Sequence, residues 1–103
     1  MTSLENDRKA PVVQRADYTV WFEWALGRTW VHCDVRRWTP AVRRALAADF
    51  EMAARLHGGP LYAMAEAEHE KRHKFNTAFG FRPVAEPQHQ THRIVIYERR
   101  QEQ

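Results

Sequence analysis

The chain has 103 residues, the size of one domain, and its 44% hydrophobic content is enough for one packed core. A net charge of +3 allows an anionic partner without requiring one. The single cysteine, Cys33, excludes an intramolecular disulfide, and no apolar run reaches the ~20 residues that a membrane helix needs. Because no signal peptide opens the chain either, we expect a cytoplasmic protein that does not enter a membrane.

The first part of the chain has the pattern of β-strands. Met1–Pro11 is polar and without periodicity, which predicts a flexible N-terminal arm. Tyr18–Ala25 and Thr29–Val35 are strand-like runs on either side of Leu26-Gly27-Arg28, a sequence suited to a hairpin turn. In the second run, alternation places Val31, Cys33 and Val35 on one face and Trp30, His32 and Asp34 on the other.

A long amphipathic helix is predicted from Pro40 to about His57. Thr39 is a suitable N-cap residue, and proline is favoured at the first helical position that follows. Gly58 and Gly59 end the pattern. The helix presents one apolar stripe at helical spacing, formed by Val42, Leu46, Phe50, Ala53 and Leu56.

The remaining elements are shorter. Leu61–Ala65 is expected to be a buried strand, and Glu66–Phe79 a helix that ends at a left-handed Gly80. The face of that helix is predicted to carry Phe75, Ala78 and Phe79. Two strands close the chain, Phe81–Ala85, which Pro83 confines to an edge, and His92–Arg99, with a loop over 86–91 between them. Leu61, Phe75, Phe79 and Ile94 or Ile96 should join the helix stripe in one core.

The expected order is therefore β-β-α-β-α-β-β from Tyr18 onward. It predicts an α/β (α+β) fold in which two helices pack on a mixed sheet, because a strand–helix–strand unit makes its two strands parallel neighbours. We place one domain over residues 12–100, after the arm of residues 1–11, and a short tail over 101–103.

This order, together with Gly80-Phe81-Arg82 after a short helix, resembles the later part of the GNAT fold of N-acetyltransferases. The resemblance runs from about Tyr18 to Arg99 and leaves no room for the family's usual N-terminal helices. It implies an acetyl-coenzyme A cofactor, which Arg36, Arg37 and Thr39 would contact. Small proteins of this kind occur among bacteriophage products, so the resemblance also allows a virion-associated structural role.

Two departures from the family pattern bear on catalysis. The family binds the cofactor pyrophosphate at a glycine-rich turn before its long helix, whereas this turn contains no glycine and Pro40 lacks an N–H group. The family's tyrosine, which protonates the leaving thiolate, corresponds to Asn76, and an amide cannot supply that proton. We therefore assign no catalytic residue.

A cationic surface is predicted at the start of the long helix. We call the Arg/Trp surface the set Arg36, Arg37, Trp38, Arg43 and Arg44, with Trp30 as an extension. Arginine and tryptophan are enriched where interfaces carry their binding energy, so another protein or an anionic ligand could bind here. The alternative is a solvated polar face on which Arg43 and Arg44 pair with Asp49 or Glu51. Trp38 could also fold back on Val42 and be buried.

A second motif, His69-Glu70-Lys71-Arg72-His73, has the spacing of a zinc-hydrolase helix. Lys71 and Arg72 in its middle oppose a cation, so we expect no tightly held metal at His69 and His73.

Three functions thus remain open from the sequence. The first is an acetyltransferase-like domain that has lost acetyl-coenzyme A chemistry and serves as a binding or structural module. The second is an active N-acetyltransferase with an atypical cofactor loop, and the third is a zinc hydrolase. Nucleic acid and a second copy of the chain are further candidate partners.

Overall fold

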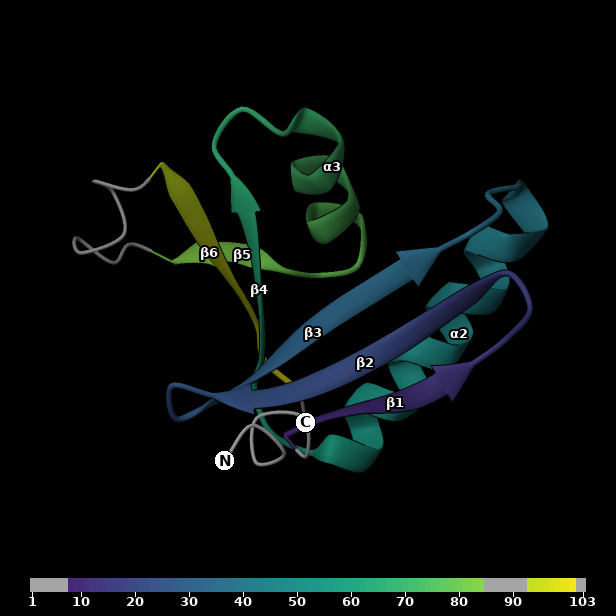
Figure 1. The fold of residues 1–103 in the computed structure, drawn as a ribbon, viewed down its shortest axis with the longest axis horizontal. Coiled ribbons are helices and arrows are strands. Elements are labelled where there is room, and N and C mark those ends of the chain that lie inside the picture. Colours follow the sequence, from purple (N-terminus) through teal and green to yellow (C-terminus); the bar gives the residue numbers. More distant parts are fainter. Residues whose placement is uncertain (1–7, 85–92, 102–103) are drawn as a thin grey trace.

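The protein is an α+β domain in which two helices pack on a six-stranded mixed sheet (Figure 1). The structure, a computed structural model, describes residues 8–84 and 93–101. The predicted fold class is confirmed. The predicted loop over 86–91 and most of the predicted N-terminal arm and C-terminal tail lie outside the described residues.

Eight elements follow one another within residues 8–84 and 93–101. They are β1 (Lys9–Gln14), β2 (Tyr18–Ala25), β3 (Arg28–Val35), α2 (Pro40–His57), β4 (Leu61–Glu66), α3 (Glu70–Ala78), β5 (Arg82–Val84) and β6 (Ile94–Arg99). The strand order in the sheet is β1-β2-β3-β4-β6-β5. The β3–β4 pair is parallel, and the other pairs among these strands are antiparallel. This agrees with the parallel neighbours expected on either side of the long helix.

Strand β1 was missed by the sequence analysis, which assigned Met1–Pro11 to an arm. Lys9–Pro11 in fact begins an edge strand antiparallel to β2, with a register shift between Pro11 and Val13. Proline lacks the N–H that a ladder uses, so it is tolerated at an edge and irregular pairing is expected beside it.

The β2–β3 hairpin is confirmed, and its turn has a defined geometry. Leu26 (φ 56°) and Gly27 (φ 72°) both have positive φ, as the two central residues of a type I′ turn require. This turn matches the twist of the two strands, so β2 and β3 pair over their full length, from Tyr18 opposite Val35 to Ala25 opposite Arg28.

Helix α2 has the predicted bounds and the predicted N-cap. The Thr39 hydroxyl accepts a hydrogen bond from the Val42 N–H at 3.1 Å, and Gly58 (φ 80°) closes the other end in the left-handed conformation. Val42, Leu46, Phe50 and Ala53 are buried as predicted, but Leu56 is 82% exposed and its assignment to the core was wrong. The buried stripe continues through Ala54, one i+4 step after Phe50, and Leu56 lies on another face.

Helix α3 starts later than predicted. The sequence analysis began it at Glu66, but β4 continues through Glu66, which pairs with Ile94. The Ala67 N–H then donates to the Arg93 carbonyl, so the chain leaves the sheet only after this point. His69 is the N-cap, and the helix runs over Glu70–Ala78.

The C-terminal end of α3 is a Schellman motif, as its glycine suggested. Gly80 has a φ of 90°, the Phe81 N–H donates to the Asn76 carbonyl at 3.0 Å, and the Gly80 N–H donates to the Thr77 carbonyl. The inward face of the helix differs from the prediction, because Ala78 is exposed and Asn76 is buried beside Phe75 and Phe79.

The core lies between α2 and the sheet. On β2 and β3, Tyr18, Val20, Val31, Cys33 and Val35 contact it, which confirms the predicted face of β3. The second half of the sheet adds Leu61, Ala63, Ala65, Phe81 and Tyr97. Phe50 joins α2 to α3 through an edge contact with Phe79, at 6.0 Å between ring centroids.

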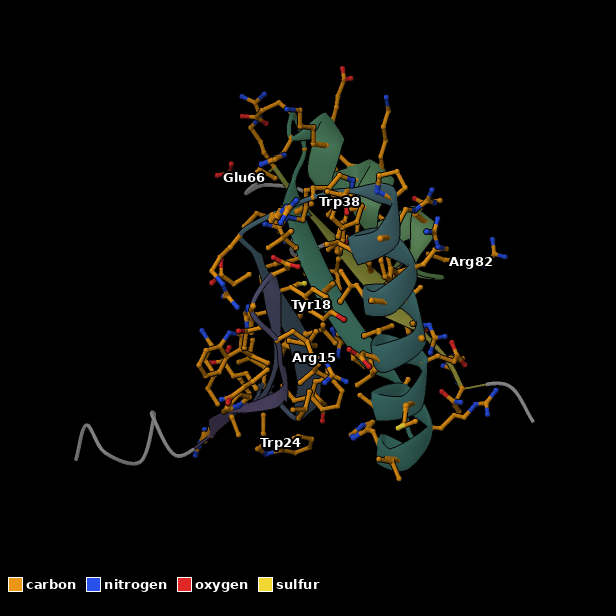
Figure 2. The ribbon with its side chains drawn as sticks, turned by 90° about the vertical axis from the view of Figure 1, so that its right-hand side faces the viewer. Arg15, Tyr18, Trp24, Trp38, Glu66 and Arg82 are labelled. Carbon is orange, nitrogen blue, oxygen red and sulfur yellow. The ribbon has the colours of Figure 1, made fainter. Side chains whose placement is uncertain are left out.

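A polar cluster at the edge of this core joins the β1–β2 turn to α2. The Arg15 guanidinium donates two hydrogen bonds to the Asp49 carboxylate, at 2.9 and 3.0 Å, and the Tyr18 hydroxyl donates a third. Figure 2 shows Arg15 and Tyr18 beside α2. The Arg15 hydrogen bonds lower the pKa of Asp49, and burial with the Asp49 hydrogen bond raises the pKa of Tyr18 to about 12.

Leu46 and Leu56 form a matched pair on α2. Leu46 is 1% exposed, so we expect Leu46→Ala to lower the free energy of unfolding by ~2–5 kcal/mol. Leu56→Ala, at the exposed position, should change it by less than about 0.5 kcal/mol. Urea denaturation measures both values, and equal losses would contradict the helix phase described here.

The Asp49 cluster should make stability depend on pH. A carboxyl group whose pKa is lowered by folding stabilises the native state above its unfolded pKa, about 3.9, and this contribution disappears as the pH falls through the folded pKa. Asp49→Asn should therefore destabilise the protein at pH 6 but much less at pH 3, as measured by urea denaturation. Asp34→Asn, at an exposed ion pair, is the control, and a pH-independent effect of Asp49→Asn would contradict the prediction.

Candidate functional site

The parallel strands β3 and β4 separate soon after they meet. Their register contains the one pair Trp30–Tyr62, and beyond it β3 and β4 diverge, with α3 over the open end (Figure 1). Trp30 is 4% exposed, packs against the Tyr62 ring, and donates its indole N–H to the Ala25 carbonyl at 2.9 Å. The two strands are therefore held together at one end and free of each other at the other.

A cavity of about 390 Å³ fills the space between the separated strands. Its walls come from both sides of the sheet. Leu46, Phe50, Phe75, Asn76 and Phe79 line it on the helix side, and Trp30, His32, Met64, Glu66 and Ile94 line it from alternate positions of the strands. The remaining lining residues are Val20, Val31, Cys33, Ala63, Ala65, His69, Arg72 and Phe81. The volume lies within the range of about 300–1,000 Å³ that is usual for small-molecule sites.

The facing edges of β3 and β4 line this cavity. Each strand pairs on its other side, β3 with β2 and β4 with β6, so among residues 8–84 and 93–101 the edges that face the gap have no strand partner beyond Trp30–Tyr62. Backbone groups along such edges can pair with an extended, amide-containing ligand.

Helix α3 contributes one face to the cavity. Arg72, Phe75, Asn76 and Phe79 follow the i, i+3, i+4, i+7 spacing, and all four line the cavity. The sequence analysis found the two phenylalanines but read Asn76 only as a missing tyrosine. The same helical spacing would have placed Arg72 and Asn76 beside them.

Two titratable side chains from neighbouring strands form a pair at the cavity. His32 Nε2 lies 2.6 Å from Glu23 Oε1, and His32 lines the cavity. The antiparallel register sets His32 opposite Trp21 and Glu23 opposite Trp30, so the pair is diagonal. The sequence analysis did not identify this pair, because it depends on the exact strand register.

Cys33 also lines the cavity, but its thiol is poorly reactive. Burial raises its pKa to about 11, against a smaller opposing effect of the nearby Arg72 charge. Because the thiolate is the nucleophilic form, Cys33 is mostly an inert thiol at neutral pH.

The residues of the predicted Arg/Trp surface have different roles. The Arg36 guanidinium donates to the carbonyls of Ala16 and Arg15, to the Thr19 hydroxyl and to the Asp34 carboxylate. Arg36 thus ties the β1–β2 turn to the end of β3. Trp30 is buried and cannot extend a surface of the free protein.

Trp38 and the other arginines are more accessible. Trp38 is 50% exposed and contacts the Phe75 ring of α3, at 6.1 Å between centroids, so it is not folded into the core (Figure 2). Asp49 and Glu51, the predicted partners of Arg43 and Arg44, instead pair with Arg15 and with Arg55 and Arg99. Within residues 8–84 and 93–101, the side chains of Arg37, Arg43 and Arg44 form no ion pair.

The N-terminus of α2 has few backbone donors to offer a phosphate. Pro40 has no N–H, the Val42 N–H is bonded to the Thr39 hydroxyl, and the Arg43 N–H is bonded to the Thr39 carbonyl. An anion at this end of the helix would therefore depend on the arginine side chains.

The zinc-hydrolase spacing does not form a metal-binding helix face. His69 lies outside α3, and its Nδ1 accepts from the Arg72 N–H. His73 Nε2 lies 2.8 Å from the Glu66 carbonyl oxygen, so it carries the proton and donates. His73 Nδ1 then accepts from the Tyr97 hydroxyl, which leaves neither ring nitrogen for a metal. In the described part of the chain, no three histidine, cysteine, aspartate or glutamate side chains are grouped as metal ligands.

Comparison of the sequence with protein-family models gives no match, and comparison with curated proteins gives none either. Over residues 8–84 and 93–101, neither helix combines the length and apolar character required to cross a bilayer.

Arg36 and Arg37 should differ in their effect on stability. Arg36→Ala removes several hydrogen bonds and should lower the free energy of unfolding by about 1–2 kcal/mol. Arg37→Ala should change it by less than about 0.5 kcal/mol, because Arg37 is an exposed residue. Urea denaturation of the two single variants tests this, and a larger loss for Arg37→Ala would contradict the assigned roles.

Proposed function

We propose that this chain is a ligand-binding module with an acetyltransferase-like fold, which holds an acyl-coenzyme A or a related acyl-bearing anion without transferring the acyl group. The observation that carries the proposal is the cavity between β3 and β4, lined from both sides of the sheet. A cavity open between two strand edges suits an elongated ligand with amide groups, such as the pantetheine arm of coenzyme A.

The charge around the cavity supports an anionic ligand. Arg72 lines the cavity, and Trp38 connects its wall to the Arg/Trp surface through Phe75. Three exposed arginines lie near the N-terminal end of α2, namely Arg37, Arg43 and Arg44. Their guanidinium N–H groups could contact phosphate groups of the ligand. The same exposed residues suit an acidic surface of a protein partner, which would serve a structural role.

Two residues that line the cavity support a module without transfer chemistry. Asn76 lies where the resemblance expects a tyrosine, and its amide cannot protonate a thiolate leaving group. The Cys33 thiol, with its raised pKa, is a poor nucleophile.

The His32–Glu23 pair favours a second candidate function, an active acyltransferase. A carboxylate that orients an imidazole is a common arrangement for a general base, and His32 lines the cavity from which an amine would attack. Under this alternative, His32 would accept the proton of the amine, and water would have to protonate the thiolate.

Calorimetric titration with acetyl-coenzyme A tests the proposal. We expect saturable binding to the wild-type protein and about tenfold weaker binding to Arg72→Ala, which loses a charge at the cavity. Arg82→Ala removes an exposed arginine on β5, outside the cavity, and should bind like the wild type. Absence of binding at millimolar ligand, or equal weakening by both substitutions, would overturn the proposed site.

The same preparations distinguish the two candidate functions. Thiol release from acetyl-coenzyme A in the presence of primary amines should stay at the background rate under the binding-module proposal. Release well above background that is lost in His32→Ala, with ligand binding retained, would replace it with the acyltransferase alternative.

A further inference from the structure

The cavity contains a buried polar group that the fold itself does not use. Asn76 is 4% exposed, and within the described residues its side-chain Nδ2 is a fully buried polar atom without a hydrogen-bond partner. Asn76 lines the cavity from α3, between Phe75 and Phe79 of the same face. A buried amide N–H without a partner destabilises the folded state, and most buried polar groups in proteins avoid that cost.

The amide is not required to end α3. The Schellman motif at Gly80 uses the backbone carbonyl of Asn76, which accepts from the Phe79 and Phe81 N–H groups. A leucine, of similar shape, could occupy the same position without an unsatisfied donor. The side chain therefore needs an explanation outside the helix, and the cavity that it lines offers one.

We propose that the Asn76 Nδ2–H group donates a hydrogen bond to the carbonyl oxygen of a short acyl group bound in the cavity. The inference rests on the proposed ligand-binding function and names the part of the ligand that the cavity recognises. A neutral amide donor suits a neutral carbonyl, as in a thioester, because a buried carboxylate would need a charged partner. The apolar chain of the acyl group then packs against Leu46, Phe50 and Phe79, which line the helix side of the cavity.

Two small probes isolate this hydrogen bond from the rest of coenzyme A. S-butyryl-N-acetylcysteamine carries the thioester carbonyl, and S-butyl-N-acetylcysteamine has a methylene in its place. The wild-type protein should bind the acyl probe about three- to tenfold more tightly than the alkyl probe, the range expected for one neutral hydrogen bond. Titrations followed by ¹⁵N–¹H spectra give both affinities.

The side-chain amide signal of Asn76 gives a direct readout. The chain contains one other asparagine, Asn6, so the Asn76 signal is assigned by its loss in Asn76→Leu. We expect the acyl probe to shift this signal and the alkyl probe to shift it much less. Asn76→Leu should remove the preference between the probes while retaining the fold, which its backbone spectrum verifies.

The possible results separate the two proposals. If both probes bind the wild type equally and Asn76→Leu changes neither affinity, the role of Asn76 is wrong and the cavity remains a ligand site. If neither probe binds while acetyl-coenzyme A does, the acyl group lies elsewhere and the inference is also wrong. If neither the probes nor acetyl-coenzyme A binds, both the role of Asn76 and the proposed function are wrong. Asn76→Asp, which has no N–H donor on its side chain, should lose the preference like Asn76→Leu and serves as a second variant.

Discussion

Strands β3 and β4 separate soon after they meet, and this divides the sheet into two halves. The two strands share the Trp30–Tyr62 pair, and the buried Trp30 holds them at this point through its contact with Tyr62 and its bond to the Ala25 carbonyl. Because the sheet gives up its hydrogen bonds beyond this pair, helix packing has to join its two halves. Phe50 does so, since it contacts Phe79 and Phe81 from α2, and Arg99 crosses from β6 to Glu51 of the same helix.

Because the strands separate, side chains that a continuous sheet would cover line the cavity instead. His32, Met64 and Glu66 lie on the strands on one side of the cavity, and Phe75 and Asn76 lie on α3 on the other. The polar groups are few and the apolar wall is extensive, which is the composition of a small-molecule site. Chemistry and binding can be separated in such a site. Acyl transfer would need a proton donor, which the side-chain amide of Asn76 does not provide.

Much of the fold could be predicted from the sequence, because capping residues and the spacing of apolar residues indicate the same helices and strands. Thr39-Pro40 at one end and Gly58 at the other bound α2, and alternation in Thr29–Val35 correctly placed Val31, Cys33 and Val35 on one face of β3. Leu56 was assigned to the core because it is an apolar residue near the end of the helix. It does not lie on the face that Val42, Leu46 and Phe50 define, and it is exposed. Strand β1 was missed because its residues are mostly exposed. Such a strand does not need to alternate apolar and polar residues, so its sequence lacks the usual strand pattern.

The candidate site was predictable only in part. The sequence located the helix and the glycine beside the cavity, but the role of Arg36 depends on the carbonyls of Ala16 and Arg15, which no pattern displays. The His32–Glu23 contact depends on strand register, and a shift of one residue would place these side chains on opposite faces. The start of α3 was predicted too early because β4 extends through Glu66, and His69 is consequently the N-cap of the helix.

The prolines of the sheet have a consequence for how the protein meets other chains. Pro11 lies in β1 and Pro83 in β5, the two outer strands, and β1 is irregular where Pro11 lies. Both rims of the sheet are thus poor templates for strand addition, which protects a small β-rich protein against end-to-end polymerisation. The strand edges that lack this protection face inward across the cavity. An extended peptide could therefore add to these edges only by entering the cavity between β3 and β4, where the lining residues would limit its size and polarity.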